Sequence, residues 1–183
     1  NRKSPKCLKR NAQVQVWIQR HQPERVYLIA AWPAWANATG GYPLEDTSGM
    51  RGNDRIFPIA YQRTLQAIRP YVREIVVVGP VPGAPDFLPY QLALVEWIGR
   101  EPPPPVIRSD FDKDAREFWQ VAERPIAGVQ SIDPSPWFCG RVKCRYMDAG
   151  RLLYRDGNHL STDGARFAAK HLEVTRGSSV SGL

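Results

Sequence analysis

The sequence lacks the features that mark a membrane-spanning or secretory segment. No part of its 183 residues approaches the roughly 18 consecutive apolar residues that a membrane helix needs. The opening residues 1–10 are basic and polar, and they contain no apolar stretch of the kind found in signal peptides. We therefore expect nothing in this sequence to span a bilayer or to direct secretion.

Cysteine is scarce, with three residues in the whole sequence. Cys139 and Cys144 lie five positions apart in a stretch that is typical of a tight β-hairpin. Such spacing can close a small disulfide loop if the two strands face each other, and it is equally compatible with two buried free thiols. Cys7 then has no partner, which suggests a bond to a residue upstream.

The remaining composition is that of a globular protein, with 43% hydrophobic and 23% charged residues. A chain of this length fits one domain with a sizeable core that needs no structural metal. We assign residues 1–175 to that domain. The Gly/Ser-rich residues 176–183 are predicted to form a flexible tail.

The net charge of +7 favours an anionic partner, such as an acidic or phosphorylated glycan, a lipid headgroup or nucleic acid. Most lysines and arginines are scattered and do not form a stripe with interleaved aromatic residues, so we predict no binding to nucleic acid. The densest group of cations lies in residues 2–10, and we interpret it as a solvated terminus.

Buried-type strands alternate with amphipathic helices along the chain. Nearly continuous apolar runs predict strands at 26–32, 74–80 and 128–134. Helical spacing predicts helices over 11–22, 57–71, 91–99, 112–124 and 162–175. Residues 33–55 are rich in glycine and proline and predict a long loop. This alternation predicts an α/β sandwich with a parallel sheet.

Asp156 and His159 are the candidate catalytic residues. They lie three positions apart on a loop before the last predicted helix, where ligands bind in parallel α/β folds. The carboxylate can hold one ring nitrogen of the histidine, while the other nitrogen accepts a proton from a hydroxyl nucleophile. The short Asp-x-x-His spacing alone is also compatible with a surface histidine and a capping carboxylate.

The longer segment 139–165, CGRVKCRYMDAGRLLYRDGNHLSTDGA, carries a family resemblance. It resembles the C-terminal part of the SGNH hydrolase domain, in the version fused to acyltransferase-3 membrane proteins that O-acetylate bacterial surface glycans. The Asp-x-x-His pair, the following Leu160-Ser161 and the pair Gly164-Ala165 match the last block of that family. Asp133-Pro134 and the segment 79–82 also resemble it, so the likeness covers roughly residues 7–172.

The resemblance implies a three-layer α/β/α fold with a flavodoxin-like sheet, and it implies that Asp156 and His159 form the catalytic dyad. It also implies that Trp32 lines the site, although a packing role for this side chain remains open. Gly52-Asn53-Asp54 superficially resembles the oxyanion-hole block of SGNH enzymes. We interpret it instead as a turn with a helix N-cap at Asn53 or Asp54.

The family's first block, a Gly-Asp-Ser stretch that supplies the nucleophile, is absent from the sequence. Ser48 follows Asp46-Thr47 but lies in the long loop, and Ser161 is better placed to cap the last helix. Ser4 has no strand before it. We therefore expect a truncated domain that lacks its N-terminal strand or strands, with the apolar strand 26–32 at an uncovered edge.

These features predict part of an acyltransferase or esterase domain that transfers or removes O-acetyl groups on cell-envelope glycans such as lipopolysaccharide. The expected partners are a glycan or acylated sugar and an acyltransferase-3 membrane domain encoded upstream, at the periplasmic face of the inner membrane. We expect no cofactor and no metal, and no activity from this chain alone. The alternative is a non-catalytic, glycan-binding module with the same fold.

Overall fold

The computed structural model describes residues 5–38, 41, 43–46 and 48–180. The chain divides into two compact units. The first contains residues 1–79 and 114–132, and the second contains residues 80–113 and 133–183. Helix α5 (Arg108–Ala122) begins in the second unit and ends in the first.

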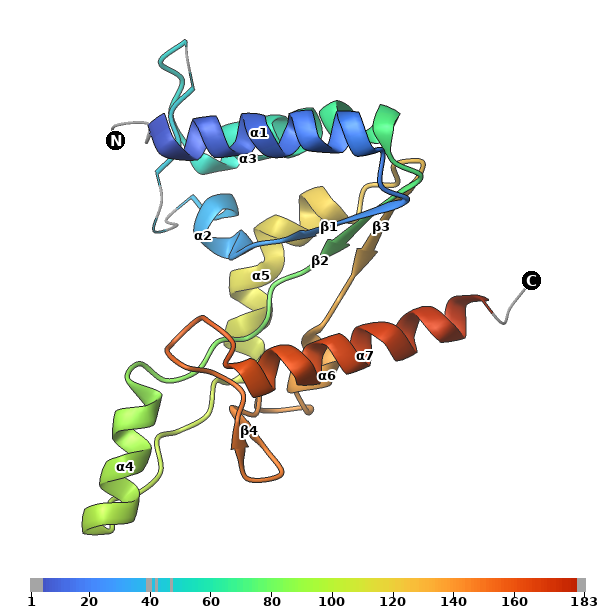
Figure 1. The fold of residues 1–183 in the computed structure, drawn as a ribbon. Helices are drawn as coiled ribbons and strands as arrows, with labels where there is room; N and C mark the ends of the chain where they lie inside the picture. The colour runs from blue at the N-terminus through green and yellow to red at the C-terminus, as the bar shows by residue number, and fades with distance from the viewer. Residues whose placement is uncertain (1–4, 39–40, 42, 47, 181–183) are drawn as a thin grey trace. The chain divides into compact units, whose positions relative to one another are not determined.

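The first unit is built on a parallel three-stranded sheet, visible in Figure 1. The strands of this sheet are β1 (Arg25–Ile29), β2 (Glu74–Val78) and β3 (Val129–Ile132). The unit also contains α1 (Pro5–His21), α2 (Trp32–Ala36), α3 (Asn53–Ile68) and a 3-10 turn (Arg69–Tyr71). The strand order is β1-β2-β3, with Val26 opposite Ile75 and Ile75 opposite Val129. The predicted α/β class with a parallel sheet and flanking helices is therefore confirmed.

The observed strand order agrees with the flavodoxin-like order 2-1-3-4-5, in which the last three strands are successive neighbours. β2 lies in the centre, and Ile75, Val76 and Val77 are fully buried. β1 pairs with β2 only, among the strands of the described residues. Its residues Tyr27 and Ile29 are 39% and 69% exposed, as expected for an edge strand.

The core of the first unit lies where α1, α3 and the end of α5 meet one face of the sheet. Ile75 and Val77 alternate along β2 and so point to the same face, where they join a buried cluster with Ile18, Leu65 and Phe118. α1 and α3 contact each other on this face. The predicted amphipathic pattern is borne out in part. In α3, Leu65 and Ile68 are buried as expected, whereas Ile59 is 39% exposed. In α1 only Ile18 is buried, and the other apolar residues of the pattern are exposed.

Two expectations for residues 26–55 need correction. Trp32 is the first residue of α2 and does not end the strand, because β1 stops at Ile29. Pro33 suits the first turn of a helix, where its missing N–H costs no hydrogen bond. α2 ends at Ala36 and α3 begins at Asn53, so the connection between them is shorter than the loop predicted over residues 33–55.

The second correction concerns the start of α3. Its N-cap is Gly52, at φ 111°, rather than Asn53 or Asp54. Asn53 is 2% exposed, and its Oδ1 accepts a hydrogen bond of 2.8 Å from the N–H of Leu44. The side chain therefore holds the preceding loop against the helix.

The second unit contains α4 (Leu88–Ile98), α6 (Ser135–Phe138), the short strands β4 (Met147–Asp148) and β5 (Arg151–Leu152), and α7 (Thr162–Val180). Phe138, Leu153 and Tyr154 are at most 1% exposed. α4 buries only Leu88 and leaves Tyr90 and Trp97 exposed. α7 continues through residues 176–180 of the segment predicted to be a flexible tail, and residues 181–183 lie outside the described range.

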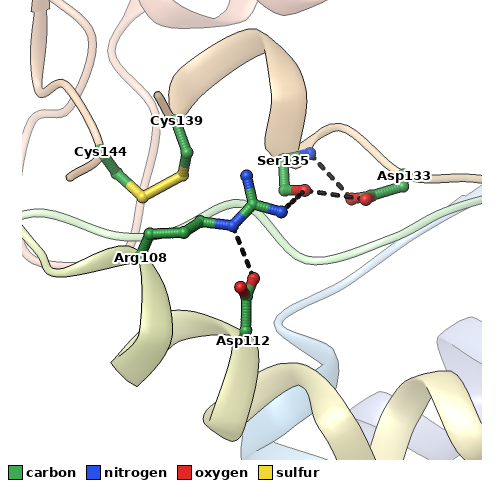
Figure 2. The surroundings of a disulfide bond; sticks show 6 residues. All are labelled: Arg108, Asp112, Asp133, Ser135, Cys139 and Cys144. Atoms are coloured by element: carbon green, nitrogen blue, oxygen red, sulfur yellow. Dashed lines mark hydrogen bonds and ion pairs between the residues drawn. A yellow bond between two sulfur atoms is a disulfide. The ribbon is translucent and has the colours of Figure 1, made fainter. Parts of the chain in front are cut away.

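Cys139 and Cys144 form a disulfide, which decides between the two interpretations of their spacing. Figure 2 shows the bond beside the start of α5. The two cysteines pair as neighbours in an antiparallel bridge, and the N–H of Gly140 donates to the carbonyl of Lys143 at 3.0 Å. The predicted hairpin is therefore confirmed. Cys7 lies in α1, and its side chain is outside the described part of the structure.

Among the described residues, no helix is both long enough and apolar enough to cross a membrane.

Candidate active site

Asp156 and His159 lie on a narrow turn that is held closed by backbone hydrogen bonds. The N–H of Arg155 donates to the carbonyl of His159 at 3.0 Å, and Tyr154 pairs with Leu160 in an antiparallel bridge. Tyr154 is fully buried, whereas Asp156 and His159 have side chains that are 44% and 61% exposed. The turn is therefore anchored in the core at its base and presents the candidate pair to solvent at its tip.

The Asp156 carboxylate organises this tip. Its Oδ1 accepts hydrogen bonds from the N–H groups of Asn158 and His159, at 3.1 and 2.8 Å. This is the arrangement in which an Asx side chain stabilises a turn two residues further on. Both carboxylate oxygens lie 3.0 Å from Nδ1 of His159. The structure therefore brings together the two residues that the sequence predicted to form a dyad.

The same contacts keep Asp156 ionised. Hydrogen bonds from the N–H groups of Asn158 and His159 lower the pKa of its carboxyl from 3.8 to about 2. Desolvation opposes this shift, and the His159 side chain lowers the pKa by a smaller amount than either backbone N–H. A carboxylate at Nδ1 fixes the tautomer in which Nε2 carries the free lone pair. His159 is thus arranged to accept a proton through Nε2.

The segment after β2 contacts the back of this turn, a feature that the sequence analysis missed. The N–H of Ala84 donates to the carbonyl of Gly157 at 2.9 Å. A Cβ on Gly83, whose φ is +51°, would lie 2.7 Å from the same carbonyl oxygen, and a Cβ on Gly157 would lie 2.6 Å from Oδ1 of Asp86. Glycine at both positions therefore allows two backbone segments to approach closely.

Ser4 lies outside the described residues, and neither Ser48 nor Ser161 completes a triad. Ser161 caps α7: its Oγ accepts the N–H of Gly164 at 3.0 Å and donates to the carbonyl of Leu152. Ser48 donates its hydroxyl to Asp46 at 2.7 Å in an exposed loop. Within the described residues, His159 forms no hydrogen bond to a serine hydroxyl. The cap predicted at Ser161 is confirmed.

Figure 2 shows a further serine, the buried Ser135, in a polar network with Asp133, Arg108 and Asp112. Its Oγ donates to Asp133 Oδ2 at 2.8 Å and accepts a hydrogen bond from Arg108 at 3.1 Å. Arg108 also pairs with Asp112 at 2.7 Å. Since Ser135 is 2% exposed and its proton is directed to a carboxylate, this network fixes the segment that leads from β3 to the disulfide.

Trp32 lies in an aromatic cluster of the first unit. Its ring stacks on Phe118 with centroids 5.1 Å apart, and it meets Phe57 and Tyr61 edge-on. Its indole N–H donates to the carbonyl of Val78 at 2.7 Å. These contacts give Trp32 a packing role, and its predicted place in the substrate site stays a prediction.

The comparisons with known proteins agree with these features. The family described as SGNH domain (fused to AT3 domains) matches residues 1–173. The chain therefore belongs to this family, as its Asp-x-x-His block predicted. No curated protein matches the chain.

One similar solved structure is the periplasmic domain of a lipopolysaccharide acetyltransferase from Salmonella ser. Paratyphi A. The two share 20% sequence identity with a TM-score of 0.63, over 92% of this chain and 62% of that chain. At this identity the likeness establishes the fold, and the present chain spans less than two thirds of its relative's length.

Proposed function

We propose that this chain is part of an SGNH-type domain that transfers or removes O-acetyl groups on bacterial cell-surface glycans. The observation that carries the proposal is the paired geometry of Asp156 and His159, with Nδ1 of the imidazole 3.0 Å from both carboxylate oxygens, inside a family match that covers residues 1–173. The family's fusion to AT3 domains and the likeness to a periplasmic acetyltransferase domain support a role at the periplasmic face of the membrane.

In the proposed mechanism His159 acts as general base and then as general acid. Nε2 accepts the proton of a serine hydroxyl as the serine oxygen attacks the carbonyl carbon of an acetyl ester. The tetrahedral intermediate collapses as the imidazolium returns the proton to the leaving oxygen, which leaves an acetyl-serine. A sugar hydroxyl or water then attacks in the reverse sequence, and Asp156 stabilises the imidazolium in both halves.

The nucleophile is the part of the mechanism that these residues do not supply. We propose that a Gly-Asp-Ser stretch elsewhere in the polypeptide provides it, together with an AT3 membrane domain as partner.

The test uses the chain alone and the chain extended by the coding sequence that precedes Asn1. A fluorophosphonate probe should label a serine only in the extended protein, which should also hydrolyse 4-nitrophenyl acetate. His159→Ala should then lower kcat by about 1,000-fold or more, because the base of a serine triad is removed. His21→Ala is the matched control. Within the described residues, His21 hydrogen-bonds to the carbonyl of Trp17 in its own helix and to no other group, and its ring stacks on the Trp17 ring.

Three outcomes would contradict this assignment. Labelling of the chain alone would place the nucleophile within these residues, and equal activity of the two histidine variants would exclude His159 as the base. The absence of any Gly-Asp-Ser stretch from the preceding coding sequence would instead favour the glycan-binding module without catalysis.

A further inference from the structure

Helix α1 carries a row of cations on one side, which we call the cationic face. Residues at spacings of three, four, seven, eleven and fourteen positions lie on one side of an α-helix. The cationic face consists of Lys6, Lys9, Arg10, Gln13, Trp17 and Arg20. No aspartate or glutamate occurs between Pro5 and His21, so the whole helix has a positive charge.

The cationic face is free of the rest of the first unit. All six of its side chains are exposed. α1 is held to the core by Ile18, which is 5% exposed and belongs to the buried cluster on the face of the sheet that carries Ile75 and Val77. None of the four cations joins an ion pair with any described residue.

Apolar groups accompany these cations. Trp17 is 53% exposed, and its ring stacks on His21 with centroids 4.4 Å apart and planes at 18°. Val14 and Val16 are 52% and 61% exposed, one on each border of the cationic face. A surface that covers this face would therefore meet both positive charge and exposed apolar side chains.

We propose that the cationic face of α1 binds the surface of a lipid bilayer that contains anionic phospholipids. The lysines and arginines lie at the phosphates with their aliphatic stems extended, and Trp17 lies at the boundary between headgroups and acyl chains. A hydrated acidic polysaccharide or a nucleic acid would satisfy the cations but would leave Val14 and Val16 in water. A bilayer surface accommodates both kinds of group, because apolar chains lie directly below its phosphates.

The test is sedimentation of the 183-residue chain with vesicles of phosphatidylcholine that contain, or lack, phosphatidylglycerol. Binding should require phosphatidylglycerol and should weaken as salt is added. The triple substitution Lys6→Glu, Lys9→Glu and Arg10→Glu should weaken binding by about 100-fold or more, since each surface cation contributes about a factor of five. Trp17→Ala should weaken it several-fold at unchanged charge.

The matched control reverses three exposed cations elsewhere and so produces the same net charge. It combines Arg141→Glu, Lys143→Glu and Lys170→Glu. Circular dichroism establishes that both triple variants remain folded. If they lose equal affinity, attraction is a property of net charge and the proposal is wrong.

A competition assay separates lipid from other polyanions. Two results together would overturn the proposal: dextran sulfate displaces the chain from vesicles, and it binds the Trp17→Ala variant as tightly as the unsubstituted chain. They would show that the cationic face binds polyanions in general. A blue shift of tryptophan emission on vesicles that is lost in Trp17→Phe supports insertion at the headgroup boundary. Equal shifts in the two proteins would contradict it.

Discussion

At the scale of single residues, the candidate site depends on a carboxylate that organises its own turn. Asp156 accepts two backbone N–H groups and faces the imidazole of His159, so four consecutive residues contain the whole arrangement. The serine at the end of the turn is used differently, because Ser161 caps the next helix. A serine two positions after the candidate histidine therefore need not belong to the candidate site.

The lowered pKa of Asp156 predicts how stability depends on pH. Because the folded pKa of about 2 lies below the ordinary 3.8, the carboxylate stabilises the fold above about pH 4, and this contribution is lost as the pH falls through about 2. Asp156→Asn should therefore be less stable than the unsubstituted chain at neutral pH, with a difference that shrinks between pH 4 and 2. Urea unfolding across this range measures the difference.

The control for this prediction is Asp148→Asn, which removes an equal charge from an exposed carboxylate paired with Arg145. NMR titration of the Asp156 carboxyl carbon provides a direct check. A midpoint at the ordinary value of 3.8 would refute the assigned hydrogen bonds.

Gly164 lies in helix α7, where it allows the close approach of Leu153. A Cβ at this position would lie 1.9 Å from the carbonyl oxygen of Leu153, a backbone atom that cannot rotate away. Ala normally favours a helix by about 1 kcal/mol over Gly, but overpacking of this kind costs about 1–3 kcal/mol or more. Gly164→Ala should therefore lower the free energy of unfolding by about 2 kcal/mol, as measured by urea denaturation.

Gly140→Ala serves as the comparison, because its new Cβ would lie at an ordinary 3.7 Å from the nearest atom. The two glycines should differ clearly in denaturation midpoint. A Gly164→Ala variant as stable as the comparison would mean that α7 does not pack on Leu153.

At the scale of elements, the edge strand β1 dominates the expected behaviour of the chain. Among the described residues it pairs on one side only, and Ile29 is 69% exposed. An unpaired, apolar edge is a template for association with another chain. We expect the isolated chain to self-associate and Ile29→Lys to reduce association, as measured by light scattering against concentration.

Val142→Lys provides a control at a site with the same 69% exposure but in the disulfide hairpin, away from any sheet edge. It adds the same charge and should leave association nearly unchanged. The prediction would be wrong if the chain were a monomer that melts cooperatively at high temperature and Ile29→Lys had no effect. The edge of β1 would then not promote self-association.

At the scale of the whole molecule, the two units carry different features. The second unit holds the Asp156–His159 turn and the disulfide, and the first holds the sheet, the aromatic cluster around Trp32 and the cationic face of α1. The lipid-binding proposal depends on how part of the +7 net charge is placed. Four exposed cations of α1 lie on one face of the helix beside the exposed Trp17, and Val14 and Val16 border that face.

The sequence by itself determined the features that depend on neighbours along the chain. The three strands, the hairpin around Cys139, the cap at Ser161 and the Asp156–His159 pair all follow from residues at most a few positions apart. Element ends were less predictable, since Trp32 begins a helix and Gly52, not Asn53, caps the next. Local propensities determine the type of an element more reliably than they determine the residue at which it ends.

Only the tertiary structure decided the contacts between distant segments. The approach of Gly83 and Ala84 to Gly157, the packing of Gly164 on Leu153 and the stacking of Trp32 on Phe118 join backbone or rings that periodicity cannot relate. The exposure of the cationic face of α1 likewise depends on which side of the helix packs on the core. Ile18 is the residue of α1 in the buried cluster, and the cationic face is exposed. Such contacts depend on three-dimensional packing, because a residue's spacing in sequence says nothing of which distant surface covers it.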